Sequence, residues 1–317
     1  MNYERFFAFH NSAARIYVSA ALLFVVLTIL TAVIPAIEAN ATPPSNRVKP
    51  YTPLAEEGRA LYIGEGCGYC HTQQVRPLPG DKIFGPPSLA GDYAYDKPMI
   101  AGTERTGPDL SNVGARQPND TWHLIHLWNP RAVVPNSVMP SYSWYFVIKD
   151  HADPGDTVVP VPTGYGPSGK VVVATHQAMA LVAYLKSLNR TGPAPAQQAL
   201  GGGALSTGES EQLGAKVYAA NCATCHQTTG RGVAGVFPPL DGDPIVAATD
   251  ASAMVSTVLH GTQNRVIGGV KYPGQMPAFK NVLTPAEIAA VTTFVRESWR
   301  NHAPDVTTEQ VIKEASK

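Results

Sequence analysis

The sequence predicts a mainly α-helical protein in which one N-terminal transmembrane helix is followed by two small domains, the first with an added β-hairpin. Three observations predict this class. An uncharged apolar run lies near the start of the chain. A short cysteine–histidine motif occurs twice, and each copy lies between a helical segment that opens a domain and one that closes it. A length of 317 residues also suits two domains.

The apolar run extends from Ile16 to Ile37 and contains 22 residues without a charge. At about 1.5 Å per residue it spans roughly 33 Å, enough for the hydrocarbon core of a bilayer. A cleaved signal peptide is the competing interpretation, because Ala39-Asn-Ala41 looks like a cleavage site. The run is longer than a usual signal core, so we expect an uncleaved anchor.

The composition argues for small domains built around a cofactor. The 24 basic residues balance the 24 acidic ones, so nothing indicates a nucleic-acid partner. Charged residues make up only 15% of the chain, and Gly and Pro number 28 each. Such a composition is typical of loop-rich domains in which a bulky cofactor replaces part of the core.

The repeated motif is C-x-x-C-H, the attachment site of a c-type haem. Its two copies use all four cysteines of the chain. A thioredoxin-like redox pair or a four-thiolate zinc site would also use C-x-x-C pairs, but neither explains the histidine after each pair. We therefore expect two covalently bound haem c groups. Their attachment residues and proximal iron ligands are Cys67, Cys70 and His71, and Cys222, Cys225 and His226.

The orientation in the membrane follows from the haem motifs. Arg5 and Arg15 precede the apolar run and Arg47 and Lys49 follow it, so the positive-inside count is nearly tied. Covalent haem is attached on the outer side of the bacterial cytoplasmic membrane. We therefore expect a single-pass protein of that membrane with its N-terminus in the cytoplasm and everything after about residue 40 in the periplasm.

Composition shifts along the chain predict the domain boundaries. Prolines stiffen a spacer after the helix, and a Pro- and Gly-rich stretch separates the two haem domains. The polar tail is expected to form a surface helix or to be disordered. The predicted segments are a cytoplasmic N-terminus at 1–15, the transmembrane helix at 16–37, the spacer at 38–51, the first haem domain at 52–189, the linker at 190–207, the second haem domain at 208–302 and the tail at 303–317.

Local signals predict the helices and the hairpin. Thr284 and Pro285 form a helix start, and an apolar stripe from Ile288 to Trp299 follows it. Two β-prone runs at 157–161 and 170–174 flank a Gly- and Pro-rich turn, and Pro160 would confine the first run to a sheet edge. The predicted opening and closing helices are Leu54–Glu65 with His176–Leu188, and Glu209–Ala220 with Pro285–Trp299.

A haem that only transfers electrons needs a sixth ligand, usually Met or His. Met139 and Met276 each stand before a proline, downstream of their own motif and before the closing helix, so we expect them to ligate the two irons. Met99 is the competitor at the first haem. The remaining candidates have ordinary structural interpretations. Met179 and Met254 are expected in the core, His123 and His126 at the surface or the haem periphery, and His260 in no functional role.

The proximal histidines need an acceptor for their second ring nitrogen, and the haem carboxylates need cations. Pro238, twelve residues after His226, offers a fixed backbone carbonyl, and Pro108 offers the same to His71. Each proline has a plain turn as its alternative. Arg76 and Arg131 are candidates for the carboxylates of the first haem, with solvated surface charge as the alternative.

A series of short motifs in the first half resembles the membrane-anchored mono-haem cytochrome c subunit (subunit II) of cbb3-type cytochrome c oxidases, over roughly residues 1–190. The resemblance implies that Cys67, Cys70, His71 and Met139 hold a haem that passes electrons to a separate haem–copper catalytic subunit. The motifs are Gly58-Arg-Ala-Leu-Tyr-Ile63, Gly66-Cys-Gly-Tyr-Cys-His71, Gln74-Val-Arg-Pro77, Ala90-Gly-Asp-Tyr-Ala-Tyr-Asp96, Arg105-Thr-Gly-Pro-Asp-Leu110, Asn129-Pro-Arg131 and Val134-Pro-Asn-Ser-Val-Met-Pro140.

The second half departs from that family, whose subunit ordinarily ends after one haem domain. Residues 214–299 are similar to class I cytochrome c domains fused to oxidases and periplasmic dehydrogenases. We therefore expect a non-catalytic dihaem relay, in which a periplasmic cytochrome c or other donor reduces the second haem and the first haem supplies the membrane partner. A nitric oxide reductase or dehydrogenase subunit, a dihaem peroxidase and a gas sensor are the alternatives.

Overall fold

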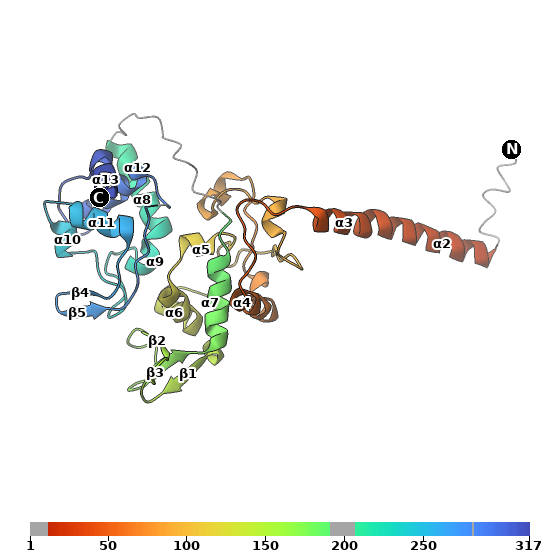
Figure 1. Ribbon diagram of the computed structural model, residues 1–317, viewed down its shortest axis with the longest axis horizontal. Coiled ribbons are helices and arrows are strands. Elements are labelled where there is room, and N and C mark those ends of the chain that lie inside the picture. Colours follow the sequence, from red (N-terminus) through yellow and green to blue (C-terminus); the bar gives the residue numbers. More distant parts are fainter. Residues whose placement is uncertain (1–11, 191–206, 281) are drawn as a thin grey trace. The chain divides into compact units, whose positions relative to one another are not determined.

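The computed structural model describes residues 12–190, 207–280 and 282–317 (Figure 1). Most of the predicted linker at 190–207 and of the N-terminal segment at 1–15 lies outside these residues. The contacts divide the chain into two units, one formed by residues 1–49 and 89–99 and the other by 50–88 and 100–317. Helices dominate both units, as the sequence predicts.

The N-terminal apolar run forms one continuous helix from Ala13 to Ala41. It consists of α2 (Ala13–Thr28), a wider π-helical stretch η2 (Ile29–Val33) and α3 (Ile34–Ala41). By length and composition this 29-residue helix can cross a membrane, and none of it is buried. It continues past the predicted end at Ile37, so the first residues of the predicted spacer are helical.

The rest of the predicted spacer is bound to a later loop of its own unit. The Ser45 backbone N–H donates to the Gly91 carbonyl at 3.0 Å, and the Ser45 hydroxyl donates to the buried carboxylate of Asp92 at 2.5 Å. Arg47 lies 3.7 Å from the same carboxylate. This part of the spacer is therefore hydrogen bonded to the loop at 91–92.

The second unit contains two helices that cross closely, α4 (Pro53–Gly64) near its start and α7 (His176–Ser187) much later in the chain. Both start at a threonine whose hydroxyl accepts a backbone N–H, Thr52 for α4 and Thr175 for α7. A Cβ on Gly58 would overlap the Ala180 carbonyl, so only glycine lets the two backbones approach this far. The predicted helices are confirmed to within a residue at each end.

Short elements between α4 and α7 carry the rest of the first haem domain. The predicted hairpin is confirmed: β2 pairs with β3 in antiparallel register, and β2 is an edge strand that ends before Pro160. An unpredicted strand β1 pairs with the other side of β3. These elements are η3 (Cys67–Tyr69), η4 (Pro79–Phe84), α5 (Val113–Arg116), α6 (Asp120–Trp128), η6 (Pro130–Ala132), η7 (Ser143–Tyr145), β1 (Phe146–Lys149), β2 (Thr157–Val159) and β3 (Val171–Ala174).

The part of the chain predicted to be the second haem domain repeats the crossing of first and last helices. A Cβ on Gly214 of α8 would overlap the Ala290 carbonyl of α12. A capping box joins Thr284 and Glu287 at the start of α12, as the helix-start signal predicts. The elements are α8 (Thr207–Asn221), α9 (Ala223–His226), α10 (Pro244–Ala247), α11 (Ser252–His260), β4 (Arg265–Ile267), β5 (Val270–Tyr272), α12 (Pro285–Glu297) and α13 (Thr308–Ala315).

Two expectations for the C-terminal end need correction. The closing helix ends at Glu297, and Trp299 lies beyond it with a φ of 58°, its ring packed over Gly230. The tail forms α13, which is more than a surface helix. Its Val311 is fully buried in a cluster with Val255 of α11 and Ile288 of α12, so the tail closes one side of the second haem domain.

Candidate haem sites

The first C-x-x-C-H motif forms a single tight turn. Gly66 precedes it with a φ of 70°, a left-handed conformation that glycine adopts without strain. The backbone N–H groups of Cys70 and His71 both donate to the Cys67 carbonyl, at 3.2 and 3.1 Å. One turn thus presents two thiols and an imidazole together, as covalent haem attachment requires.

The imidazole of His71 is held by the loop at 107–108. Its Nδ1 lies 2.7 Å from the Pro108 carbonyl oxygen, the contact that the sequence predicts. Burial lowers the pKa of His71, which favours the neutral ring with its proton on Nδ1. Because Nδ1 is engaged, Nε2 is free to bind a metal. A Cβ on Gly107 would overlap the ring, so this loop lies directly against the imidazole.

Met139 and Cys67 pack against the same hydrophobic cluster of the first domain. Tyr142, three residues after Met139, hydrogen bonds with the Cys67 thiol, and burial raises the pKa of that thiol to about 11. Met99, the competing ligand, belongs to the other unit and is 49% exposed. These positions favour Met139 over Met99 as the sixth ligand of the first haem. Ligation by Met139 stays a prediction.

The remaining methionines lie where the sequence places them. Met254 is buried in the core of the second domain, and Met179 packs against that of the first.

Of the two arginines proposed to bind the haem carboxylates, one pairs with a carboxylate of the protein and the other is exposed. Arg76 donates to Asp81 at 3.0 Å, and its side chain is 55% exposed. Arg105 approaches the same carboxylate from the other side at 2.6 Å, and the two cations hold the pKa of Asp81 far below its usual range. Arg131 is exposed. A part for Arg76 or Arg131 in haem binding stays a prediction.

The histidines of α6 are inside the domain, which corrects the surface position considered for them. His123 is only 3% exposed, and its Nε2 lies 2.7 Å from the Gln117 carbonyl. Burial lowers the pKa of His123 to about 4 and that of His126 to about 3. His260 is exposed, and its Nδ1 lies 3.2 Å from the Ser256 carbonyl oxygen of its own helix.

The second motif repeats the turn. The backbone N–H groups of Cys225 and His226 donate to the Cys222 carbonyl at 3.2 and 2.9 Å. His226 Nδ1 lies 2.9 Å from the Pro238 carbonyl oxygen, the second predicted contact. Burial lowers the pKa of His226 and raises the pKa of both thiols to about 12.

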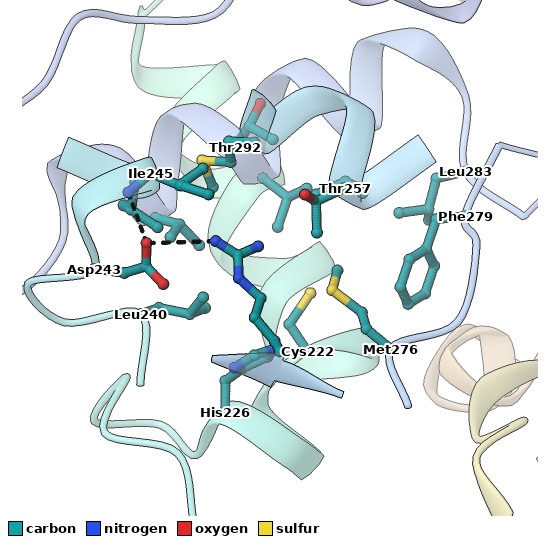
Figure 2. Close-up of a pocket in the computed structure, with 16 residues that line it drawn as sticks. Cys222, His226, Leu240, Asp243, Ile245, Thr257, Met276, Phe279, Leu283 and Thr292 are labelled. Atoms are coloured by element: carbon teal, nitrogen blue, oxygen red, sulfur yellow. Dashed lines mark hydrogen bonds and ion pairs between the residues drawn. The ribbon is translucent and has the colours of Figure 1, made fainter. Parts of the chain in front are cut away.

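A partly open cavity lies above this turn. Figure 2 shows Cys222, His226 and Met276 around it, with Leu240, Phe279 and Leu283 among its apolar walls. Two thiols, an imidazole and a thioether on an apolar cavity are the donor set of a covalent His/Met haem, so the residues fit the group. Haem c bound there supplies a one-electron carrier; the chain supplies its ligands and its dry surroundings.

Two charged side chains that line this cavity, those of Arg265 and Asp243, were not predicted from the sequence. Arg265 of β4 lines the cavity, is 19% exposed, and places Nη2 at 3.9 Å from the carboxylate of Asp243. Asp243 in turn accepts the backbone N–H of Ile245 at 2.7 Å and caps α10 (Figure 2). A guanidinium in a cavity with mostly apolar walls is a suitable partner for a haem carboxylate. Arg265 lies 39 residues after His226, too far for a local signal.

The zinc interpretation finds no support in the geometry. Within the described parts of the chain, no three His, Cys, Asp or Glu side chains are grouped so that they could hold a metal ion.

The two halves of the chain match two families. Residues 8–160 match the family described as "Cytochrome C oxidase, mono-heme subunit/FixO", and residues 211–299 match "Cytochrome c".

Among curated proteins, the chain is similar to the cytochrome c subunit of a quinone alcohol dehydrogenase from Komagataeibacter europaeus, with 28% identity over 81% of this chain and 51% of that subunit. Cytochrome c-552 of Thermus thermophilus is 38% identical over 27% of this chain and 67% of its own length. Subunit FixP of the cbb3-type cytochrome c oxidase of Rhizobium etli is 35% identical over 26% of this chain and 28% of FixP.

The chain spans about half the length of the dehydrogenase subunit. Both family matches and the cytochrome c-552 likeness agree with the two haem-type turns described above. The chain belongs to the cytochrome c family, with a FixO-type mono-haem subunit domain joined to a C-terminal cytochrome c domain.

Proposed function

We propose that this chain is a dihaem relay of a membrane haem–copper oxidase of the cbb3 type, which carries electrons from a periplasmic donor to a catalytic subunit that reduces oxygen. The observation that carries the proposal is the FixO match over residues 8–160, which includes the apolar helix and the first C-x-x-C-H turn. The first haem belongs in the half that resembles an oxidase subunit. It is therefore the one that supplies the catalytic subunit.

Two haems are proposed because the chain builds the same arrangement twice. Each turn places an imidazole Nδ1 against a proline carbonyl, at 2.7 Å for His71 and 2.9 Å for His226. Met139 and Met276 then complete the axial pairs. Closed His/Met coordination suits electron transfer, and it speaks against a dihaem peroxidase, which needs one open iron position.

The residues have separable tasks in this relay. Cys67, Cys70, Cys222 and Cys225 hold the two haems by thioether bonds. The Pro108 and Pro238 carbonyls fix the proton of each imidazole on Nδ1 and make Nε2 a stronger ligand. The apolar walls of the second site exclude water, so that little reorganisation accompanies each electron transfer. Electrons pass from the donor to the second haem and then to the first.

A quinone-dependent dehydrogenase is the second candidate partner. It is favoured by the likeness to the alcohol dehydrogenase cytochrome subunit, which extends over 81% of this chain, although at 28% identity. In that case the same relay would carry electrons from a periplasmic substrate oxidation, and the chain would take them from the dehydrogenase.

Purification of the affinity-tagged chain from its native membranes tests the proposal. We expect a haem–copper subunit to co-purify and the complex to consume oxygen with a reduced cytochrome c as donor. The same complex from a His71→Gly strain should keep its subunits and lose that activity, whereas exposed Lys271→Gln should keep both. Co-purification of a dehydrogenase with no oxygen consumption would overturn the oxidase assignment.

The order of electron flow is tested separately by stopped-flow reduction of the purified complex. The second haem should be reduced before the first. If the donor reduced the first haem before the second, the result would contradict the proposed direction.

A further inference from the structure

A single buried carboxylate ties together the two segments that enclose the first imidazole. Asp109 follows Pro108, whose carbonyl accepts from His71, and Thr72 follows His71 itself. The Thr72 hydroxyl donates to Asp109 Oδ2 at 2.6 Å. The backbone N–H of Gln74 donates to the same oxygen at 2.9 Å, and that of Ser111 donates to Oδ1 at 2.8 Å. Asp109 is completely buried.

These contacts hold the loop at 107–108, which has no room to move towards the imidazole. The loop lies so close to the ring that a Cβ on Gly107 would overlap it. Backbone hydrogen bonds already join the segments, from Leu110 N to the Thr72 carbonyl at 2.8 Å and from Gly107 N to the Cys70 carbonyl at 3.0 Å. The carboxylate adds side-chain bonds to both segments. Any movement of Asp109 therefore moves the Pro108 carbonyl relative to His71.

Two arginines lie against Asp109, and one of them, Arg116, donates to its backbone carbonyl. The Arg105 guanidinium lies 3.6 Å from Asp109 and donates to the Thr72 hydroxyl at 2.7 Å. It also pairs with Asp81 at 2.6 Å. A buried carboxylate without such partners would be strongly unfavourable, so Arg105 makes its position possible. Asp109 thus places a carboxylate, paired with Arg105, next to the acceptor of the first imidazole.

The second haem site has the same imidazole contact without the carboxylate. There Pro239 follows Pro238, in the place that Asp109 takes after Pro108. The His226–Pro238 contact is nevertheless 2.9 Å long. A carboxylate in this place is therefore not needed to make the contact. The second site has its own buried carboxylate, Asp243, but that one caps α10, whereas Asp109 bonds the segment that follows the imidazole.

We propose that Asp109 is a positioning residue of the first haem site, which fixes the Pro108 carbonyl against His71 and lowers the reduction potential of the first haem relative to the second. The inference rests on the proposed function, because it takes the first motif to hold a haem. A nearby negative charge favours ferric over ferrous iron, and a firmly held Nδ1–H acceptor makes the imidazole a stronger donor to ferric iron.

The test is a redox titration of the full-length chain carrying both haems, followed by visible absorption and by electron paramagnetic resonance. In Asp109→Asn, the ratio of reduced to oxidised first haem at a fixed potential should rise about threefold to tenfold, where tenfold is 59 mV for a one-electron couple. The second haem should keep its potential. The matched control is Asp156→Asn, which removes another carboxylate that pairs with a cation, Lys149, and accepts a backbone N–H, but in the loop between β1 and β2.

Thr72 provides a second test if Asp109→Asn does not mature. Thr72→Val removes the hydroxyl donor and keeps the shape, so it should change the paramagnetic resonance signal of the first haem alone; Thr72→Ser should restore it. An unchanged first potential in Asp109→Asn, or an unchanged signal in Thr72→Val, with both haems present, would overturn the inference. Absence of haem at the first motif in the unaltered chain would instead overturn the proposed function.

Discussion

The carbonyl oxygen of Pro238 lies 2.9 Å from Nδ1 of His226, a residue twelve positions earlier in the chain. The first site makes the same contact over 37 positions, from His71 to Pro108. Two loops of very different length thus end in one geometry, in which Nδ1 is engaged and Nε2 is left for a metal. This requirement of the imidazole, rather than loop length, is what the two halves of the chain share.

The first prediction concerns the sixth ligands. Methionine raises the reduction potential of a haem relative to histidine. Met139→His should therefore lower the potential of the first haem and Met276→His that of the second, each by more than a tenfold change in the reduced-to-oxidised ratio, about 59 mV. Redox titration of each variant measures this and assigns the two potentials. If Met139→His leaves both potentials in place, another residue is the ligand.

Arg265 should act on the second haem only. A cation near the haem destabilises the more positively charged ferric state. Arg265→Gln should therefore lower the second potential, with about a threefold change in the reduced-to-oxidised ratio. The control is Lys271→Gln on the paired strand β5, an exposed cation of the same hairpin. Equal shifts in both variants would show a general charge effect and remove the role assigned to Arg265.

The crossings of the opening and closing helices predict two sensitive glycines. Gly58→Ala and Gly214→Ala place a methyl group against a carbonyl of the partner helix, and each should lower the free energy of unfolding by about 1–3 kcal/mol. Gly64→Ala on α4, with no atom within 4 Å, should be neutral or stabilise by up to about 1 kcal/mol. Urea unfolding of the haem-loaded chain measures all three. A Gly58→Ala chain as stable as Gly64→Ala would contradict the close crossing.

Local chemistry made much of this architecture predictable. The cap at Thr284, the edge strand that ends before Pro160 and the two C-x-x-C-H turns each depend on neighbouring residues, and the structure has all of them. The two proline contacts were predictable because a neutral imidazole needs an acceptor for Nδ1.

Features that depend on distant residues were not predicted. Strands β1, β4 and β5 have only three or four residues, and pairing rather than propensity forms them. Arg265 reaches the second cavity only because its strand folds over it. The burial of His123 likewise depends on the packing of α6, which its sequence does not reveal.

Stability should fall in mild acid because of His123. Burial lowers its native pKa from 6.5 to about 4, so between these values the unfolded chain binds more protons than the native one. The contribution of the neutral His123 to the free energy of unfolding is therefore fully present above about pH 6.5. It falls as the pH falls towards 4, by about 1.4 kcal/mol per pH unit at most. Urea unfolding at about pH 7 and pH 5 measures this. His123→Gln should lose less stability across that interval, and an equal loss would contradict the assignment.

The most direct test of the relay is the haem content and spin state of the purified full-length chain, from its intact mass and its ferric absorption spectrum. The account predicts two covalently bound haems c per chain, both low-spin, with the charge-transfer band of methionine sulfur bound to ferric iron. That band should weaken in Met139→His and Met276→His and vanish in the double variant. One haem per chain, or a high-spin haem in the unaltered protein, would contradict it.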